Sequence, residues 1–125
     1  LKSIEVRKEL TDEWETRGVQ KRQEFAILTD EITKAWSGLS TRRYKQIKGL
    51  KKEGLRDNMT NLELVLNMLA EATTTEISRE KQPEGLEQNR VIAKQGGTIA
   101  GNTRKEIEEK TGKPVVSPIN AKQLK

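Results

Sequence analysis

The sequence predicts an all-α fold, an irregular bundle of about five helices around a central hydrophobic helix at about residues 61–80. Apolar residues recur along most of the 125-residue chain at the three- and four-residue spacing of a helix face. Charged residues make up 34% of the chain, which suits a bundle whose outer faces lie in water. The length allows one compact domain but not two separate cores. Because only 32% of the residues are hydrophobic, the core is thin, and a homodimer is one way to stabilise it.

Two helices are predicted in the first third of the chain. Residues 3–17 and 23–36 carry apolar side chains on one helix face, which are Ile4, Val6, Leu10 and Trp14 in the first and Phe25, Leu28, Ile32, Ala35 and Trp36 in the second. Gly18 and Gly38 follow as helix ends, because glycine readily adopts the left-handed conformation that closes a helix. Aromatic residues at this spacing are predicted to belong to the core.

The third and fourth helices are marked by their first residues. Ser40 is a favoured cap, and we expect a short helix from there through Lys48. Thr60 and Glu63 have the spacing of a capping box, in which each side chain accepts a hydrogen bond from an unpaired backbone N–H. The helix that follows, at about 61–80, is apolar nearly all round. We therefore expect it at the centre of the bundle, with other helices around it.

Helical spacing returns after Pro83, with the pair Gly96-Gly97 in its middle, so this part is either one kinked helix or two helices. Two of the three prolines fall close to the C-terminus, which predicts an extended arm there. We therefore divide the chain into a helical domain at residues 1–112 and an extended tail at residues 113–125.

Small residues recur at helical spacing in this last helical part, at Ala93, Gly97, Ala100 and Gly101. Such a stripe lets a second helix approach closely, so it is predicted to be a helix-packing or dimer face. Residues 96–103 also come close to the phosphate-binding pattern G-x-x-x-x-G-K-[ST], but Asn102 stands where the lysine is needed. We therefore expect no nucleotide-binding loop there.

The composition argues against catalysis. The chain has no cysteine for a disulfide or a thiolate metal site, and no histidine for zinc or for a base near neutral pH. Paired carboxylates are adjacent in sequence, which on a helix points them about 100° apart. We expect no enzyme activity, cofactor, metal site or small-molecule substrate. No apolar run approaches the roughly 18–20 residues of a membrane span, so we expect a cytoplasmic protein without a membrane partner.

A basic block is the most informative feature of the sequence. Lysine and arginine number 24 against 19 acidic residues, and the excess is concentrated between residues 42 and 56, with Glu53 as the one carboxylate before residue 57. Tyr44 adds a ring on which a base could stack. We predict a nucleic-acid-binding surface made of Arg42, Arg43, Tyr44, Lys45, Lys48, Lys51, Lys52 and Arg56. The alternative is a solvated helix face whose cations suit the C-terminal helix dipole.

Short segments across about residues 9–116 form a more specific pattern. They are Phe25-Ala26-Ile27, Tyr44-Lys45-Gln46-x-Lys48-Gly49-Leu50-Lys51-Lys52, Leu55-x-Asp57-x-Met59, Glu63-Leu64 and Ala72-Thr73-x-Thr75-Glu76. Together they resemble the C-terminal region of the DNA damage-inducible protein D family. Proteins similar to this also carry an N-terminal domain of the phage antirepressor (Bro) type, so we expect the sequence to be part of a longer polypeptide.

The resemblance implies a bacterial protein of the SOS response that regulates the recombinase filament on single-stranded DNA, at the nucleoid. The family has no assigned catalytic residues, so no chemical role is carried over to this chain. Two hypotheses remain. The first is a regulatory module whose basic block contacts single-stranded DNA or the recombinase filament. The alternative is a protein–protein or oligomerisation domain of an antirepressor-like regulator, without direct contact to nucleic acid.

Overall fold

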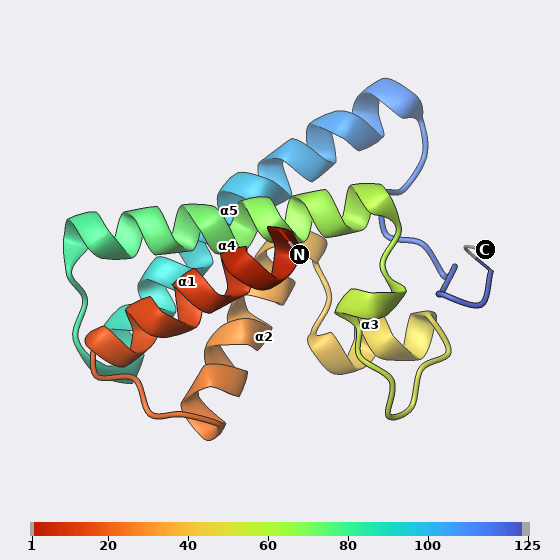
Figure 1. Ribbon diagram of the computed structural model, residues 1–125. Coiled ribbons are helices and arrows are strands. Elements are labelled where there is room, and N and C mark those ends of the chain that lie inside the picture. Colours follow the sequence, from red (N-terminus) through yellow and green to blue (C-terminus); the bar gives the residue numbers. More distant parts are fainter. Residues whose placement is uncertain (1, 124–125) are drawn as a thin grey trace.

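The computed structural model describes residues 2–123, and within them every regular element is helical (Figure 1). The elements are α1 (Lys2–Thr16), α2 (Gln23–Ser37), α3 (Thr41–Ile47), the short 3₁₀ turn η1 (Arg56–Asn58), α4 (Asn61–Lys81) and α5 (Gly85–Thr111). The predicted all-α bundle of about five helices is confirmed. Residues 1, 124 and 125, which the two predicted segments include, lie outside the described residues. No helix between residues 2 and 123 combines the length and the apolar character that crossing a membrane requires.

Local signals set most helix ends. The Ser40 hydroxyl accepts a hydrogen bond from the Arg43 N–H at the start of α3, and Thr60 and Glu63 form the predicted capping box at the start of α4. Gly38 ends α2 with a φ of 81°, a left-handed conformation that glycine adopts without strain. The question left open at Gly96-Gly97 is settled, because α5 runs through both glycines as one helix of 27 residues.

Three helices, α1, α2 and α5, pack against α4. In Figure 1, α1 lies along α4 on one side, while α5 packs against both α4 and α2. The C-terminal half of α5 projects beyond the body of the molecule, and the chain after it turns back towards α3 (Figure 1). This tail is the extended arm predicted from the prolines, and it seals one end of the core with Val115, which is 7% exposed.

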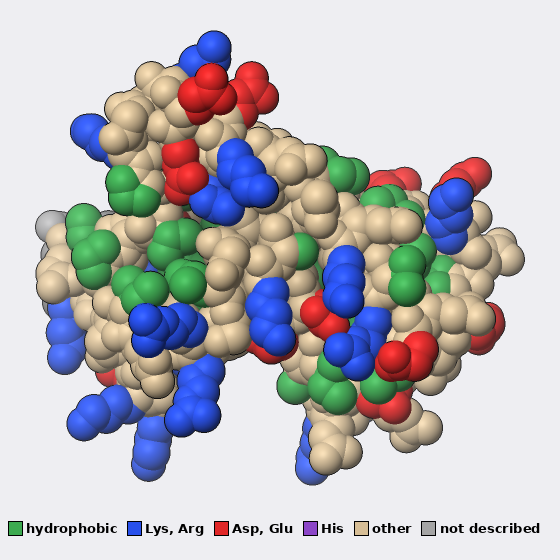
Figure 2. All heavy atoms as spheres, turned by 180° about the vertical axis from the view of Figure 1, so that it is seen from behind, with side chains coloured by type: hydrophobic (Ala, Val, Ile, Leu, Met, Phe, Trp, Pro, Cys, Tyr) green, Lys and Arg blue, Asp and Glu red, His purple; other side chains and the backbone are tan. Residues whose placement is uncertain are grey.

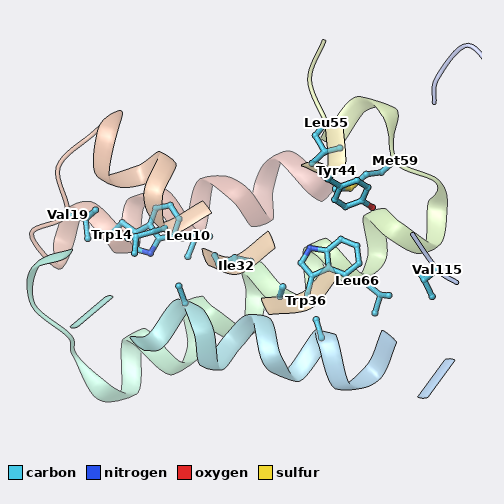
Figure 3. Close-up of a cluster of buried hydrophobic side chains, with 14 of the residues drawn as sticks. Leu10, Trp14, Val19, Ile32, Trp36, Tyr44, Leu55, Met59, Leu66 and Val115 are labelled. Carbon is cyan, nitrogen blue, oxygen red and sulfur yellow. The ribbon is translucent and has the colours of Figure 1, made fainter. Parts of the chain in front are cut away.

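Two tryptophans anchor the core, as their spacing predicted. Trp14 and Trp36 are completely buried, in different parts of the cluster drawn in Figure 3, with Val19 beyond Trp14 and Val115 beyond Trp36. Trp36 meets the Tyr44 ring edge-on at a centroid distance of 6.0 Å, and its indole N–H donates to the Asn67 side chain at 3.1 Å. The aromatic contact therefore joins α2 to α3, and the hydrogen bond joins α2 to α4.

The buried face of α4 is more polar than its sequence indicates. It consists of Glu63, Leu66, Asn67, Ala70, Glu71, Thr74, Thr75 and Ser78, whereas Leu62 is 42% exposed and Val65 is 58% exposed. The threonines tolerate burial because their hydroxyls donate to carbonyls one turn back, as Thr74 does to Ala70 at 2.7 Å. Helices α1, α2 and α5 contact α4, as expected of a central helix, but part of its apolar surface faces outward.

The small-residue stripe of α5 is used for packing inside the chain. Ala93, Gly97, Ala100 and Gly101 are all buried. A Cβ placed on Gly97 would lie 2.6 Å from the Ala35 Cβ and 2.9 Å from the Ile32 carbonyl oxygen, both on α2. The backbones of α5 and α2 approach this closely only because glycine has no side chain. A dimer through the stripe would require these two helices to separate.

Candidate nucleic-acid interface

The structure divides the eight predicted site residues into two groups. Five cations stay on the surface of α3 and the loop after it, and we call them the basic surface: Arg42, Arg43, Lys45, Lys51 and Lys52. The other three side chains, of Tyr44, Lys48 and Arg56, make contacts inside the molecule. The difference follows from helix geometry, because Tyr44 and Lys48 are four residues apart and share the inner face of the α3 segment.

Lys48 and Tyr44 both bind Glu63 in the core. The Lys48 ammonium lies 2.7 Å from Glu63 Oε1, and both side chains of this ion pair are 0% exposed. The Tyr44 hydroxyl donates to the other oxygen, Glu63 Oε2. The prediction that Tyr44 and Lys48 lie on a nucleic-acid-binding surface is therefore wrong. A lysine in a basic run becomes a core residue here because a buried carboxylate from α4 meets it.

The same ammonium holds the C-terminal tail. Lys48 Nζ donates to the carbonyl oxygens of Ser117 at 2.8 Å and Ile119 at 2.5 Å. The Asn120 side-chain N–H donates to the Lys48 carbonyl oxygen at 3.0 Å, and Glu63 Oε2 accepts a hydrogen bond from the Ser117 N–H at 3.3 Å. All three donor positions of the ammonium are thus used, which is what a buried charge requires.

Arg56 is also part of an internal network. Its guanidinium donates to Glu71 Oε2 at 2.7 Å and to the Ser3 hydroxyl at 2.7 Å, and Arg7 reaches the same Glu71 oxygen at 3.2 Å. The Glu71 side chain is only 2% exposed. Arg56 therefore joins η1 to α1 and α4, and it does not belong to the basic surface.

The burial of Tyr44 gives a pH prediction. Burial, together with the hydrogen bond and the charge of Glu63, raises the pKa of this tyrosine far above its ordinary value of 10.0. The unfolded chain can ionise the phenol above pH 10 and the folded chain cannot, so stability is complete below that pH and falls above it by about 1.4 kcal/mol per pH unit. Because Tyr44 is the single tyrosine, absorbance at 295 nm should rise only when circular dichroism shows unfolding. A phenolate signal from the folded protein above pH 10 would contradict this prediction.

The cations of the basic surface are not neutralised by ion pairs within the described residues. None of Arg42, Arg43, Lys45, Lys51 and Lys52 forms an ion pair with a carboxylate of residues 2–123. In Figure 2, Lys and Arg side chains project from the end of the molecule that holds α3, with few acidic side chains among them. Unpaired cations that stand together attract polyanions, because binding releases the counterions of the phosphates.

A groove lies beside this surface, between the first turns of α2 and the helix α3. We call it the α2–α3 groove; its volume is about 810 Å³, and its wall includes Arg7, Arg22, Phe25, Ala26, Asp30, Arg42, Lys45, Leu50 and Lys51. The lower outline of the molecule in Figure 2 is hollowed between the lobes that hold these two elements. The volume is in the range of natural ligand pockets. Among the groove cations only Arg42, Lys45 and Lys51 come from the predicted block.

The sequence prediction missed Arg22 and Phe25 as groove residues. Phe25 is only half-buried, although its spacing indicates a core position, because it lies in the first turn of α2, at the end of the helix. Arg22 has a φ of 68°, a left-handed conformation that is unusual for a residue with a side chain. The one available signal was the pairing of a cation and an aromatic three residues apart, which also occurs by chance.

A search of the described residues for other chemistry gives little. Between residues 2 and 123, acidic side chains do not gather in groups of three or more that could hold a metal ion. The remaining polar clusters tie helices together, as when Arg90 on α5 binds Glu31 on α2 at 2.7 Å. The basic surface and the groove beside it are therefore the best candidates for a functional site.

Comparison with known proteins gives one match. A family model described as the DinD C-terminal domain matches residues 2–125, which is nearly the whole chain. No curated protein matches, and no solved structure matches. The match covers the basic surface, the groove, the buried ion pair and the tail together.

Proposed function

Because the chain belongs to the family of DinD C-terminal domains, the family predicted from its sequence segments, we propose that it is a non-enzymatic module of the DNA-damage response that regulates recombinase filaments on single-stranded DNA. The family supplies the DNA damage-inducible context. The contact with DNA and with the recombinase is our proposal, as is a location at the nucleoid in the cytoplasm.

One observation carries this proposal, namely five cations on one short helix and its loop that form no ion pair within the described part of the chain. With 24 basic and 19 acidic residues, one-to-one pairing must leave some cations without a partner, and the structure pairs Lys48, Arg56 and Arg90 while leaving the cations of the basic surface unpaired. The basic surface keeps its charges exposed, although like charges close together repel one another. A phosphate backbone would relieve this repulsion, which favours a polyanionic partner.

Binding to a labelled oligo(dT) strand should depend steeply on salt. If the basic surface contacts about four phosphates, the single-strand slope of roughly 0.7 per phosphate predicts about a 50-fold loss of affinity between about 50 and 200 mM salt. The variant Lys45→Glu, Lys51→Glu, Lys52→Glu should lose at least about tenfold in affinity. Fluorescence anisotropy measures both effects. Lys48 is left intact in this variant because its charge is part of the core.

A matched control separates this surface from net charge. Lys94, Lys105 and Lys110 lie exposed on α5, so their triple change to glutamate alters the net charge equally. The control variant should bind oligo(dT) with at most a few-fold change. Equal losses in both variants would show a general charge effect and would overturn the assignment to the basic surface.

The recombinase part of the proposal needs its own test. Sedimentation of recombinase filaments formed on single-stranded DNA should carry the chain into the pellet, and the basic-surface triple variant should stay in solution. Recombinase without DNA serves as the comparison. If the triple variant sediments with the filaments as well as the unmodified chain does, the basic surface is not the filament contact. This outcome would leave the proposal of direct DNA binding intact.

The alternative, a protein–protein or oligomerisation module, is favoured by one observation on α4. Leu62 and Val65 stand one turn apart and are 42% and 58% exposed, so they offer an apolar face that the small-residue stripe no longer provides. Sedimentation equilibrium of the same samples distinguishes the two functions. A monomer that binds oligo(dT) excludes the homodimer, whereas a dimer that binds no strand supports the alternative.

A further inference from the structure

We propose that the α2–α3 groove is the place where single-stranded DNA inserts an unpaired base, which lies against the Phe25 ring while the neighbouring phosphates contact Arg22, Lys45 and Lys51. This inference rests on the proposed function and deepens it, because it assigns a nucleotide site that the basic block alone does not contain. The groove combines an aromatic ring, an apolar floor and unpaired cations. Proteins that hold single strands use this combination.

The floor of the groove is preorganised for a flat apolar group. The Phe25 ring is half-buried and packs on Trp14 at a centroid distance of 5.3 Å, so its position is held from behind. Ala26 and Leu50 extend the apolar lining on two sides. A ring that is already ordered costs little conformational entropy when a base stacks on it.

The charges around the floor are available to phosphates. Within residues 2–123, Arg22, Arg42, Lys45 and Lys51 have no carboxylate partner. Arg7, at the back of the groove, is different, since its guanidinium is bound by Glu71 and by the Thr29 hydroxyl. The groove therefore presents four free cations beside an apolar surface.

Asp30 is the one carboxylate in the groove wall, and it is already engaged. It accepts a hydrogen bond from the Thr41 N–H at 2.7 Å and lies 3.3 Å from the Lys34 ammonium. Burial acts to raise the pKa of Asp30, but these two partners outweigh it and hold that pKa below the ordinary value. Its charge is thus compensated locally, which reduces its repulsion of a phosphate in the groove.

The apolar floor distinguishes a single strand from other polyanions. A duplex hides both faces of its bases, so it could use the cations of the groove but not the Phe25 ring. A strand of phosphates without bases would likewise use only the cations. The base contact should therefore appear as a difference between an oligo(dT) strand and an abasic strand of the same length.

The Phe25 variants test the base contact. Phe25→Leu keeps an apolar side chain against Trp14, and it should weaken binding of oligo(dT) about fivefold or more while leaving the abasic strand unchanged. Because Phe25→Leu could loosen the packing on Trp14, Ala26→Glu provides a second variant at an exposed position of the floor. Ala26→Glu should weaken the binding of both the oligo(dT) strand and the abasic strand. Equal affinity of both variants and the unmodified chain for oligo(dT) would overturn the inference.

A pair of double variants separates the groove from the basic surface around it. Arg22→Glu, Lys45→Glu changes groove residues, whereas Arg43→Glu, Lys52→Glu changes cations that do not line the groove. The first should lose at least about tenfold more affinity for oligo(dT) than the second. If the second variant loses more affinity than the first, and the unmodified chain still binds oligo(dT), the groove is not the base-binding site, but the proposed function stands. Absence of oligo(dT) binding by the unmodified chain overturns direct DNA contact and the groove together.

Discussion

Replacing Glu63 by alanine should cost about 3–5 kcal/mol of folding free energy, the largest effect that we expect from a single substitution in this chain. The change leaves the Lys48 ammonium buried without a counter-charge, at a side chain that is 0% exposed. It also removes the acceptor of the Tyr44 hydroxyl and of the Ser117 N–H. The capping box at Thr60 is lost as well, because Glu63 is its partner at the third residue of the helix.

Chemical denaturation followed by circular dichroism measures this loss. The control is Glu53→Ala, which removes an exposed carboxylate of the neighbouring loop that accepts one hydrogen bond, from the Lys51 N–H at 2.9 Å, and should change stability by at most about 1 kcal/mol. The double variant Lys48→Met, Glu63→Leu should recover part of the lost stability, because it leaves neither charge unpaired. A Glu63→Ala protein as stable as the Glu53→Ala protein would contradict the role of the buried ion pair.

The tail should respond to the same substitution. Lys48 holds the Ser117 and Ile119 carbonyls, and its geometry depends on Glu63. Limited proteolysis should therefore cut the Glu63→Ala protein after Lys113 or Lys122 sooner than it cuts the helices. Simultaneous loss of tail and helices would instead show that the whole molecule unfolds as one unit.

Replacing Gly97 by alanine should destabilise the protein by about 2–3 kcal/mol, although alanine is the better helix former by about 1 kcal/mol. The new methyl group would lie 2.6 Å from the Ala35 Cβ and 2.9 Å from the Ile32 carbonyl, so α5 must move away from α2. Gly101 is equally close, with the Ala35 carbonyl and the Trp36 Cα as neighbours. Because both glycines are in close contact with α2, α5 cannot relieve the clash by sliding along its axis.

The matched control for Gly97→Ala is Thr98→Ala, at the next and exposed position of the same helix. It should stabilise the protein slightly, since alanine has the higher helix propensity. Thermal unfolding at two protein concentrations also tests the dimer reading of the stripe. A midpoint that rises with concentration in the unmodified chain and not in Gly97→Ala would show that the stripe joins two copies, contrary to the packing described here.

The buried ion pair also positions the candidate interface. Tyr44 and Lys48 attach the inner face of α3 to α4 through Glu63, so the residues between and before them point outward. Arg42, Arg43 and Lys45 are therefore held on a rigid helix instead of a mobile loop. Arg7, bound to Glu71, supports the back of the groove in the same way.

The helices and most of their ends could be predicted from the sequence, because they depend on neighbours in the chain. The Thr60–Glu63 capping box, the Ser40 cap and the glycine at position 38 act over three or four residues, and each is found as predicted. The apolar spacing of the helices predicted at residues 3–17 and 23–36 likewise places their tryptophans in the core, as observed. The family could also be predicted, since it rests on short segments of sequence.

The tertiary structure alone decided which cations face solvent, because that depends on distant partners. Lys48 and Lys51 belong to the same basic run, yet the Lys48 ammonium meets Glu63 from α4 and the tail, 15 or more residues away. The Lys51 ammonium forms no ion pair within the described residues, although its backbone N–H donates to Glu53 at 2.9 Å. The polar face of α4 is buried because threonine hydroxyls bond their own helix. The groove needs Arg22, just before α2, and Phe25 of α2 beside Lys45 of α3, and only packing brings these together.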